Sequence, residues 1–95
     1  MRFNAETHAS RYVDVARALG VAVTDLTPAA AADAAVARVE ALTRALDIPT
    51  GLRALGVDRG DFGRFAVNAL RDAYITTNPR PVSEDDVRDI CVAAY

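Results

Sequence analysis

The residues that could coordinate a transition metal are few and far apart in this sequence. The chain has one histidine, His8, and one cysteine, Cys91. A protein metal site needs several ligands that converge on one point, and neither residue has a second ligand at helical i, i+4 spacing. We therefore predict no metal site, and we interpret His8 as a solvated residue near the start of a helix.

Three consecutive acidic residues, Glu84, Asp85 and Asp86, offer the oxygen ligands that Ca²⁺ and Mg²⁺ prefer. They follow Ser83, and Ser83 with Asp86 three residues later resembles a capping box at the start of a helix. Carboxylates in the first turn of a helix interact favourably with the helix dipole. We predict that these acids stabilise a helix start and do not bind a cation.

Nucleophilic catalysis and nucleotide binding have little support in the residue pattern. Ser10 and Ser83 have no suitable base nearby in the sequence, and Cys91 falls on the apolar face of the expected last helix. The glycines of residues 51–63 lie in a helix connection and do not form the strand-turn-helix pattern that holds a pyrophosphate. We predict no catalytic residue and no cofactor-binding residue in this chain.

The elements that would position any site are helices. Apolar residues recur at three- and four-residue spacing in four segments, and no segment shows sustained alternation. The expected helices cover about residues 5–19, 28–46, 58–73 and 84–94. Asn4 or Thr7 could cap the first, Thr27 followed by Pro28 marks the start of the second, and Asp58 could cap the third. Residues 76–81 are expected to be irregular because they contain two prolines. The pattern predicts an all-α fold, a compact bundle of about four main helices.

Length and charge restrict the class of protein further. A chain of 95 residues with 52% hydrophobic residues suits one helical domain over residues 1–95. A net charge of −2 gives no positive surface for nucleic acid or an anionic membrane. Closely spaced charges in residues 1–20 argue against a signal peptide or membrane span. With a single cysteine, no internal disulfide can form, and we expect a cytoplasmic protein.

Four strings of residues resemble one protein family in their order and spacing. They are MRFN at 1–4, ARALGV at 16–21, IPTGLRALGV at 48–57 and TNPRPV at 77–82. Together they resemble the C-terminal portion of the iron-containing, group III alcohol dehydrogenases. The most specific string is NPRPV at 78–82, which is followed by an acidic helix start and by AAY at 93–95.

The resemblance implies a fragment of an NAD(P)-linked alcohol or aldehyde oxidoreductase. Such enzymes join an N-terminal α/β domain that binds NAD(P) to a helical domain that holds Fe²⁺ or another divalent metal through one Asp and three His. The metal would act as a Lewis acid on the substrate oxygen during hydride transfer. In the family the MRFN string follows the last metal-binding His, so we expect no counterpart of these ligands here and no catalysis by this chain alone.

The resemblance also points to two candidate residues of the substrate pocket, Tyr74 and Asn78. Relatives commonly have Ala-Cys-Thr in the segment before the NPRPV string, where this chain has Ala73, Tyr74 and Ile75. In the family this turn lies near the substrate side of the metal pocket. The alternatives are that Tyr74 packs at a helix end and that Asn78 forms a turn before Pro79.

Other functions fit parts of the sequence. One is a non-catalytic helical interaction module that descends from the same family. Another is a small acidic carrier protein, although the chain lacks the Asp-Ser-Leu attachment site of that class. Because the rest of a dehydrogenase would cover part of the surface, the expected partner is either the missing N-terminal half or a second copy of the chain through self-association.

Overall fold

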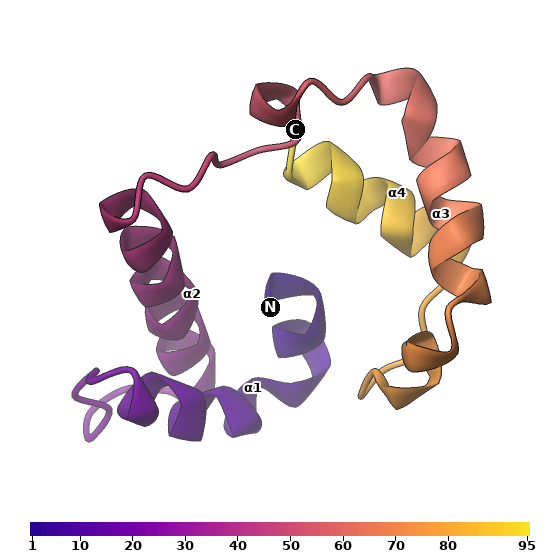
Figure 1. The fold of residues 1–95 in the computed structure, drawn as a ribbon. Helices are drawn as coiled ribbons and strands as arrows, with labels where there is room; N and C mark the ends of the chain where they lie inside the picture. The colour runs from indigo at the N-terminus through magenta and orange to yellow at the C-terminus, as the bar shows by residue number, and fades with distance from the viewer. The chain divides into compact units, whose positions relative to one another are not determined.

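Residues 1–95 are all described by a computed structural model, and every regular element in it is helical (Figure 1). The helices are α1 (Arg2–Ala18), α2 (Pro28–Ala45), α3 (Phe62–Arg71) and α4 (Glu84–Ala93), and the 3-10 helices are η1 (Arg53–Leu55), η2 (Arg59–Asp61) and η3 (Ala73–Thr77). The predicted all-α class with four main helices is confirmed. Two compact units make up the chain: unit 1 is Met1–Ile48 and unit 2 is Pro49–Tyr95. None of the helices has the length and apolar character needed to span a membrane.

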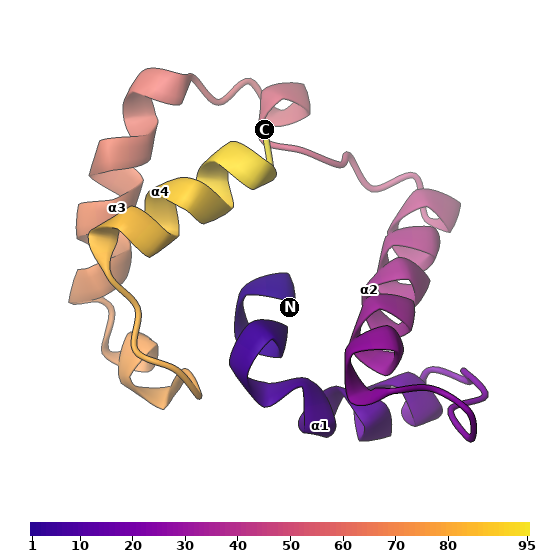
Figure 2. The same cartoon turned by 180° about the vertical axis from the view of Figure 1, so that it is seen from behind.

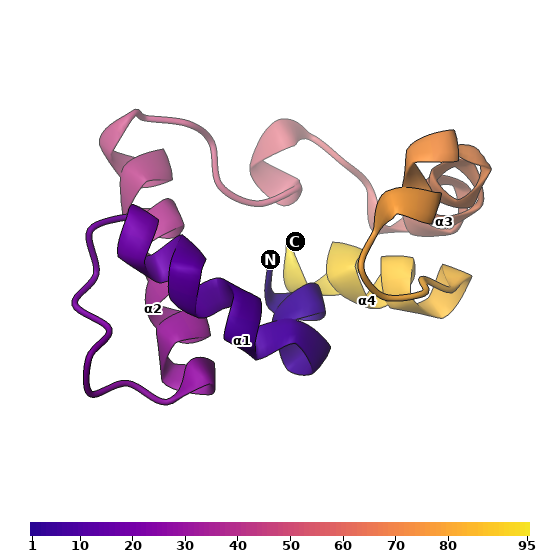
Figure 3. The ribbon, with the colours of Figure 1, turned by 90° about the horizontal axis from the view of Figure 1, so that it is seen from below.

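Unit 1 is a pair of helices that pack through alanine. Figure 3 shows α1 lying across α2. Ala16, Ala31 and Ala35 are fully buried and form the core of this contact. Methyl side chains allow two helix backbones to approach closely, so the alanine-rich segment of α2 is a packing surface. Larger side chains surround the contact: Tyr12, Val13, Leu19, Val21 and Val23.

The first helix starts earlier than its sequence predicts. It begins at Arg2, and Met1 occupies the N-cap position without a side-chain hydrogen bond. The predicted caps, Asn4 and Thr7, therefore lie inside the helix. Tertiary contacts account for the extension: the Arg2 guanidinium lies 2.9 Å from a Glu40 carboxylate oxygen on α2, and a packed helix end needs no local cap to form.

A kink interrupts α1 at His8, whose backbone angles of φ −128° and ψ 32° are not helical. The bend is visible in Figure 1 near the N-terminus. His8 is half-buried, and its Nδ1 lies 2.8 Å from the Thr7 hydroxyl. His8 is thus partly exposed to solvent, and it stands at a kink inside α1 and not at the start of the helix.

Local signals predict the ends of α2 well. The Thr27 hydroxyl accepts a hydrogen bond from the Ala30 amide at 3.2 Å, and Pro28 follows at the first helical position. At the other end, the helix terminates at Leu46, and Asp47 follows with a positive φ of 53°. Such a left-handed residue commonly ends a helix, but glycine is the residue type that adopts it without steric cost.

Replacing Asp47 with Gly is expected to raise the free energy of unfolding by about 0.5–1 kcal/mol. The change removes the steric cost of the positive φ, and it removes a carboxylate from the negative end of the helix dipole. Urea unfolding followed by circular dichroism measures the difference. The control is Ala37→Gly at an exposed position inside α2, which should lower the same free energy by about 1 kcal/mol. A loss of stability in Asp47→Gly would contradict the argument.

Unit 2 is built on α3 and α4, which Figure 2 shows side by side. Phe62, Ala66 and Cys91 are its buried residues. The prediction that Cys91 packs in the apolar interior is confirmed. The backbone amide of Leu52 donates to the Ala94 carbonyl at 2.7 Å, so the start of the unit is fastened to the end of α4.

Two short 3-10 helices in unit 2 depart from the sequence prediction. Asp58, the expected cap of the third helix, accepts a hydrogen bond from the Gly60 amide at 2.6 Å and so caps η2 instead. The segment expected to be irregular from Thr76 onward is helical as far as Thr77, because η3 covers Ala73–Thr77. Pro79 disfavours helix at Asn78, the residue directly before it, and η3 ends ahead of both residues, at Thr77.

Candidate functional site

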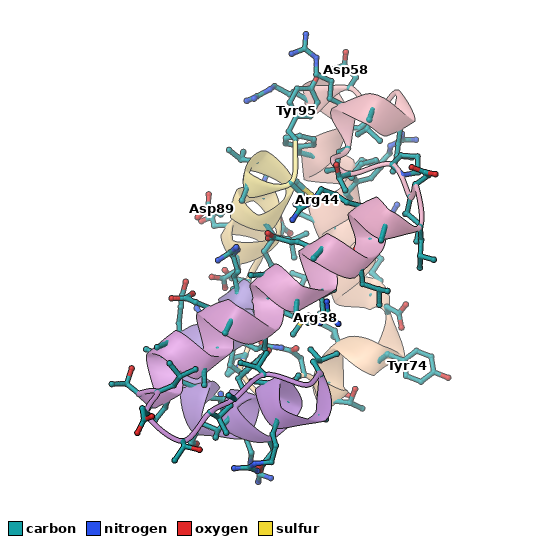
Figure 4. All side chains as sticks on the ribbon, turned by 90° about the vertical axis from the view of Figure 1, so that its left-hand side faces the viewer. Arg38, Arg44, Asp58, Tyr74, Asp89 and Tyr95 are labelled. Atoms are coloured by element: carbon teal, nitrogen blue, oxygen red, sulfur yellow. The ribbon has the colours of Figure 1, made fainter.

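Tyr74, the first candidate pocket residue, lies on the surface of η3. Its side chain is 80% exposed, and Figure 4 shows the ring projecting away from the ribbon. The backbone around it is well fixed: its amide donates to an Asp72 carboxylate oxygen at 2.9 Å, and its carbonyl accepts from the Thr77 hydroxyl at 2.8 Å. The ring therefore has no packing role within this turn, and the hydrogen bonds fix the backbone that carries it.

Asn78, the second candidate, ends the same turn and is half-buried. Its side-chain amide donates to the Arg80 carbonyl at 2.7 Å. Its backbone amide donates to the Ile75 carbonyl at 3.2 Å. Asn78 thus shapes the turn before Pro79, as its structural alternative proposes, and it shares one short segment with Tyr74.

The acidic residues at the start of α4 form a capping box. The Ser83 hydroxyl accepts from the Asp86 amide at 3.2 Å, and the Ser83 amide donates to Asp86 Oδ2 at 2.8 Å. The Ser83 hydroxyl also lies 2.6 Å from Asp86 Oδ2, and the Arg80 guanidinium lies 3.7 Å from Asp86 Oδ1. The capping box and the placement of Glu84, Asp85 and Asp86 in the first turn are confirmed.

These contacts set the ionisation of Asp86. The hydrogen bonds from the Ser83 hydroxyl and amide, aided by the Arg80 charge, hold the pKa of Asp86 below its ordinary value, although partial desolvation opposes them. A carboxyl whose pKa is lower in the folded state stabilises the fold at pH values above its unfolded pKa of about 3.9. That stabilisation is lost as the pH falls through the pKa of the folded state.

Asp86→Asn is therefore expected to reduce stability at neutral pH and to make less difference in acid. The thermal unfolding midpoint, measured from about pH 6 to about pH 2, should fall less steeply for the variant than for the parent chain. Ser83→Ala is the matched test, because it removes the hydroxyl that contributes most to the low pKa and should flatten the same profile. Parallel profiles for all three proteins would contradict this assignment.

The side chains of this chain do not fit the ligand set that the resemblance implies. Among residues 1–95, no group of three or more His, Cys, Asp or Glu side chains is placed to hold a metal ion. A set of one Asp and three His needs more than the single histidine present, and His8 stands at the α1 kink in unit 1. No chemical step is therefore assigned to a metal held by these residues alone.

Unit 2 contains a side-chain cluster that sequence reasoning missed. The guanidinium carbon of Arg59 lies 4.3 Å from the centre of the Tyr95 ring, and that of Arg53 lies 6.0 Å from it. Phe62 meets the same ring edge-on, with ring centres 5.7 Å apart. No local spacing signals this cluster, because its members come from separate elements that meet only in the folded unit.

Solved structures contain the same arrangement of helices. The crystal structure of 1,3-propanediol oxidoreductase matches 99% of this chain with a TM-score of 0.94 and 33% identity, over 25% of its own chain. Alcohol dehydrogenase from Oenococcus oeni matches 98% of this chain with a TM-score of 0.94 and 28% identity, over 24% of its own chain. The backbone is thus that of a helical part of larger alcohol-oxidising enzymes.

Sequence comparison gives the family. The family model described as the C-terminal part of the Fe-containing alcohol dehydrogenase family matches residues 1–95. The chain therefore belongs to the Fe-containing alcohol dehydrogenase family and corresponds to its C-terminal portion, as the four strings of residues predicted.

Individual relatives agree with this assignment. Lactaldehyde reductase of Escherichia coli (strain K12) is 37% identical over 95 residues, which is all of this chain and 25% of the relative. The 1,3-propanediol dehydrogenase of Klebsiella pneumoniae is 33% identical over 94 residues, or 99% of this chain and 24% of the relative. The chain spans about a quarter of the length of these relatives.

Proposed function

We propose that this chain serves as the C-terminal helical portion of an NAD(P)-linked alcohol or aldehyde oxidoreductase and is not catalytic without the rest of that enzyme. The observation that carries the proposal is the family match over residues 1–95. It favours a dehydrogenase portion over an interaction module, because both helical units follow the family sequence from end to end.

The cofactors of the whole enzyme follow from the family. The family is iron-containing, and the relatives include an NAD-dependent methanol dehydrogenase of Bacillus methanolicus and an NADPH-dependent butanol dehydrogenase of Clostridium saccharobutylicum. A bound iron would supply Lewis-acid activation of the substrate oxygen. Residues 1–95 would contribute helices that pack beside the cofactor site and support it.

Within this portion, we assign Tyr74 and Asn78 to the substrate side of the pocket. The exposure of the Tyr74 ring supports this role, because an aromatic side chain on a fixed turn offers a contact surface that unit 2 does not use. Asn78 acts by holding the turn through the Arg80 carbonyl. The single-domain organisation of residues 1–95 and a cytoplasmic location stay predictions.

The partner that we propose first is the N-terminal part of the same enzyme. Exposed aliphatic side chains on both units support the need for a covering partner, among them Leu46, Leu55 and Val92 at 61%, 61% and 51% exposure. When that part is absent, the same side chains favour self-association of the isolated chain. Analytical ultracentrifugation at tens of micromolar tests this second partner, and a monomer under those conditions would argue against it.

The decisive experiment joins the chain to the part of Escherichia coli lactaldehyde reductase that lies outside the matched 25%. The fused protein, loaded with Fe²⁺, should reduce lactaldehyde with NAD(P)H, followed by nicotinamide absorbance. The 95-residue chain by itself should neither turn over nor bind NAD(P) or Fe²⁺ in calorimetric titrations. Turnover by the isolated chain, or a folded fused protein without activity, would overturn the proposal.

In the active fused protein, Tyr74→Ala is expected to raise KM for the aldehyde several-fold with a smaller effect on kcat. The reason is that an exposed aromatic ring contributes binding area and no charge or proton. The matched control is Asp89→Asn, an exposed position on α4, which should leave both constants unchanged. Equal constants for Tyr74→Ala and the parent fused protein would remove Tyr74 from the pocket.

A further inference from the structure

The apolar face of α2 continues beyond the part that α1 covers. The first half of this face is buried in unit 1: Ala31, Ala32, Ala35 and Val36. Along the same face, at three- and four-residue spacing, Val39 is half-buried, whereas Leu42 and Leu46 are 53% and 61% exposed. We name Val39, Leu42 and Leu46 the α2 apolar stripe.

The stripe has the properties of a covered helix face. A single exposed leucine on a protein surface needs no explanation. Here, however, two leucines extend a continuous core face at its own spacing. Thr43, the polar residue next to Leu42, donates its hydroxyl to the Val39 carbonyl at 2.8 Å, so this hydroxyl is not left unsatisfied against an apolar partner.

We propose that the α2 apolar stripe is covered by the polypeptide that precedes the matched portion in full-length members of the family. This inference rests on the proposed function. The chain spans 25% of Escherichia coli lactaldehyde reductase and 24% of the Klebsiella pneumoniae relative, so most of each relative lies outside it. The structure of 1,3-propanediol oxidoreductase matches this chain with a TM-score of 0.94 over 25% of its own length. The other three quarters of that enzyme are additional polypeptide that could make this contact.

The area of the stripe favours the preceding polypeptide over a second copy of the chain as the covering partner. A stable interface between separate proteins buries about 800 Å² on each partner, and the few aliphatic side chains of the stripe offer much less. A segment of the same polypeptide needs no such area, because the covalent connection gives it a high effective concentration. The stripe therefore suits a contact within one chain better than a contact between two.

Cysteine labelling tests the proposal in the same fused protein and in the 95-residue chain. Leu42→Cys is made in a Cys91→Ala background, and the rate of reaction with a maleimide is measured in both. We expect the rate to fall by about tenfold or more in the fused protein, because the stripe is then protected. The matched control is Ala37→Cys, which is exposed on the opposite side of α2 and should react equally fast in both proteins. Leu46→Cys provides a second position on the stripe.

Three results would overturn the proposal. The first is equally fast labelling of Leu42→Cys in both proteins. The second is a labelling rate that falls with rising protein concentration in the fused protein, which would assign the stripe to a second copy. The third is slow labelling of the isolated chain at every dilution, which would assign the stripe to unit 2.

Turnover of the fused protein distinguishes this inference from the proposed function. Protection without turnover argues against the proposed function alone, and turnover without protection argues against this inference alone.

Discussion

Phe62→Ala is expected to lower the free energy of unfolding of unit 2 by about 3–4 kcal/mol. Phe62 is 6% exposed and is the largest buried side chain of that unit. Its ring also meets Tyr95 edge-on at 5.7 Å. Truncation removes the transfer free energy of the ring and leaves a cavity that the surrounding helices fill only in part, and the aromatic pair is lost as well.

Hydrogen exchange measured by mass spectrometry provides the test, because it reports the stability of α3 and α4 separately from that of α1 and α2. Amides of α3 and α4 should lose most of their protection in Phe62→Ala. The control is Asn68→Ala, an exposed position on the same helix, which should change stability by less than about 0.5 kcal/mol. If the two variants exchange alike, Phe62 does not anchor the unit.

Ala35→Leu is expected to destabilise unit 1 by about 1–3 kcal/mol, although leucine is both apolar and a good helix former. Ala35 is fully buried together with Ala16 and Ala31, where α1 lies against α2. No space exists there for the added carbon atoms, so the helices must separate or the new side chain must adopt a strained rotamer.

The matched control for Ala35→Leu is Ala37→Leu, which makes the same substitution at an exposed position of α2. Helix propensity changes equally in the two variants, so the difference between them isolates the packing at the buried position. Urea unfolding followed by circular dichroism measures both. Equal free energies of unfolding would show that the helix contact tolerates a larger side chain, and that alanine is not required for the close approach.

The family resemblance predicted one part of the candidate functional residues and missed another. The resemblance selected the turn that contains Tyr74 and Asn78, and the structure places both on one short segment ending in Asn78. Their role in a substrate pocket stays a prediction, because such a pocket needs groups from elements outside residues 1–95. The cluster of Arg53, Arg59 and Phe62 around Tyr95 had no signal in the sequence at all.

The sequence by itself determined the helical class, most helix ends and the family. Thr27 with Pro28 and Ser83 with Asp86 predicted the starts of α2 and α4 correctly. Caps of this kind depend on hydrogen bonds between residues that are neighbours in the chain, so the local sequence contains all the information. The family strings are likewise contiguous, and they matched over residues 1–95.

Only the tertiary structure decided the features that depend on contacts between distant residues. The early start of α1 is accompanied by a contact of Arg2 with Glu40 on α2, a residue far away in the sequence. The point at which α1 ceases to cover the α2 face is likewise set by how the two helices pack, and the kink at His8 had no signal in the sequence. Helical spacing marks which residues share an apolar face, but it carries no information on how much of that face a neighbour covers. For this reason the sequence assigns Val36 and Leu46 to the same apolar face, yet in the structure Val36 is buried and Leu46 is exposed.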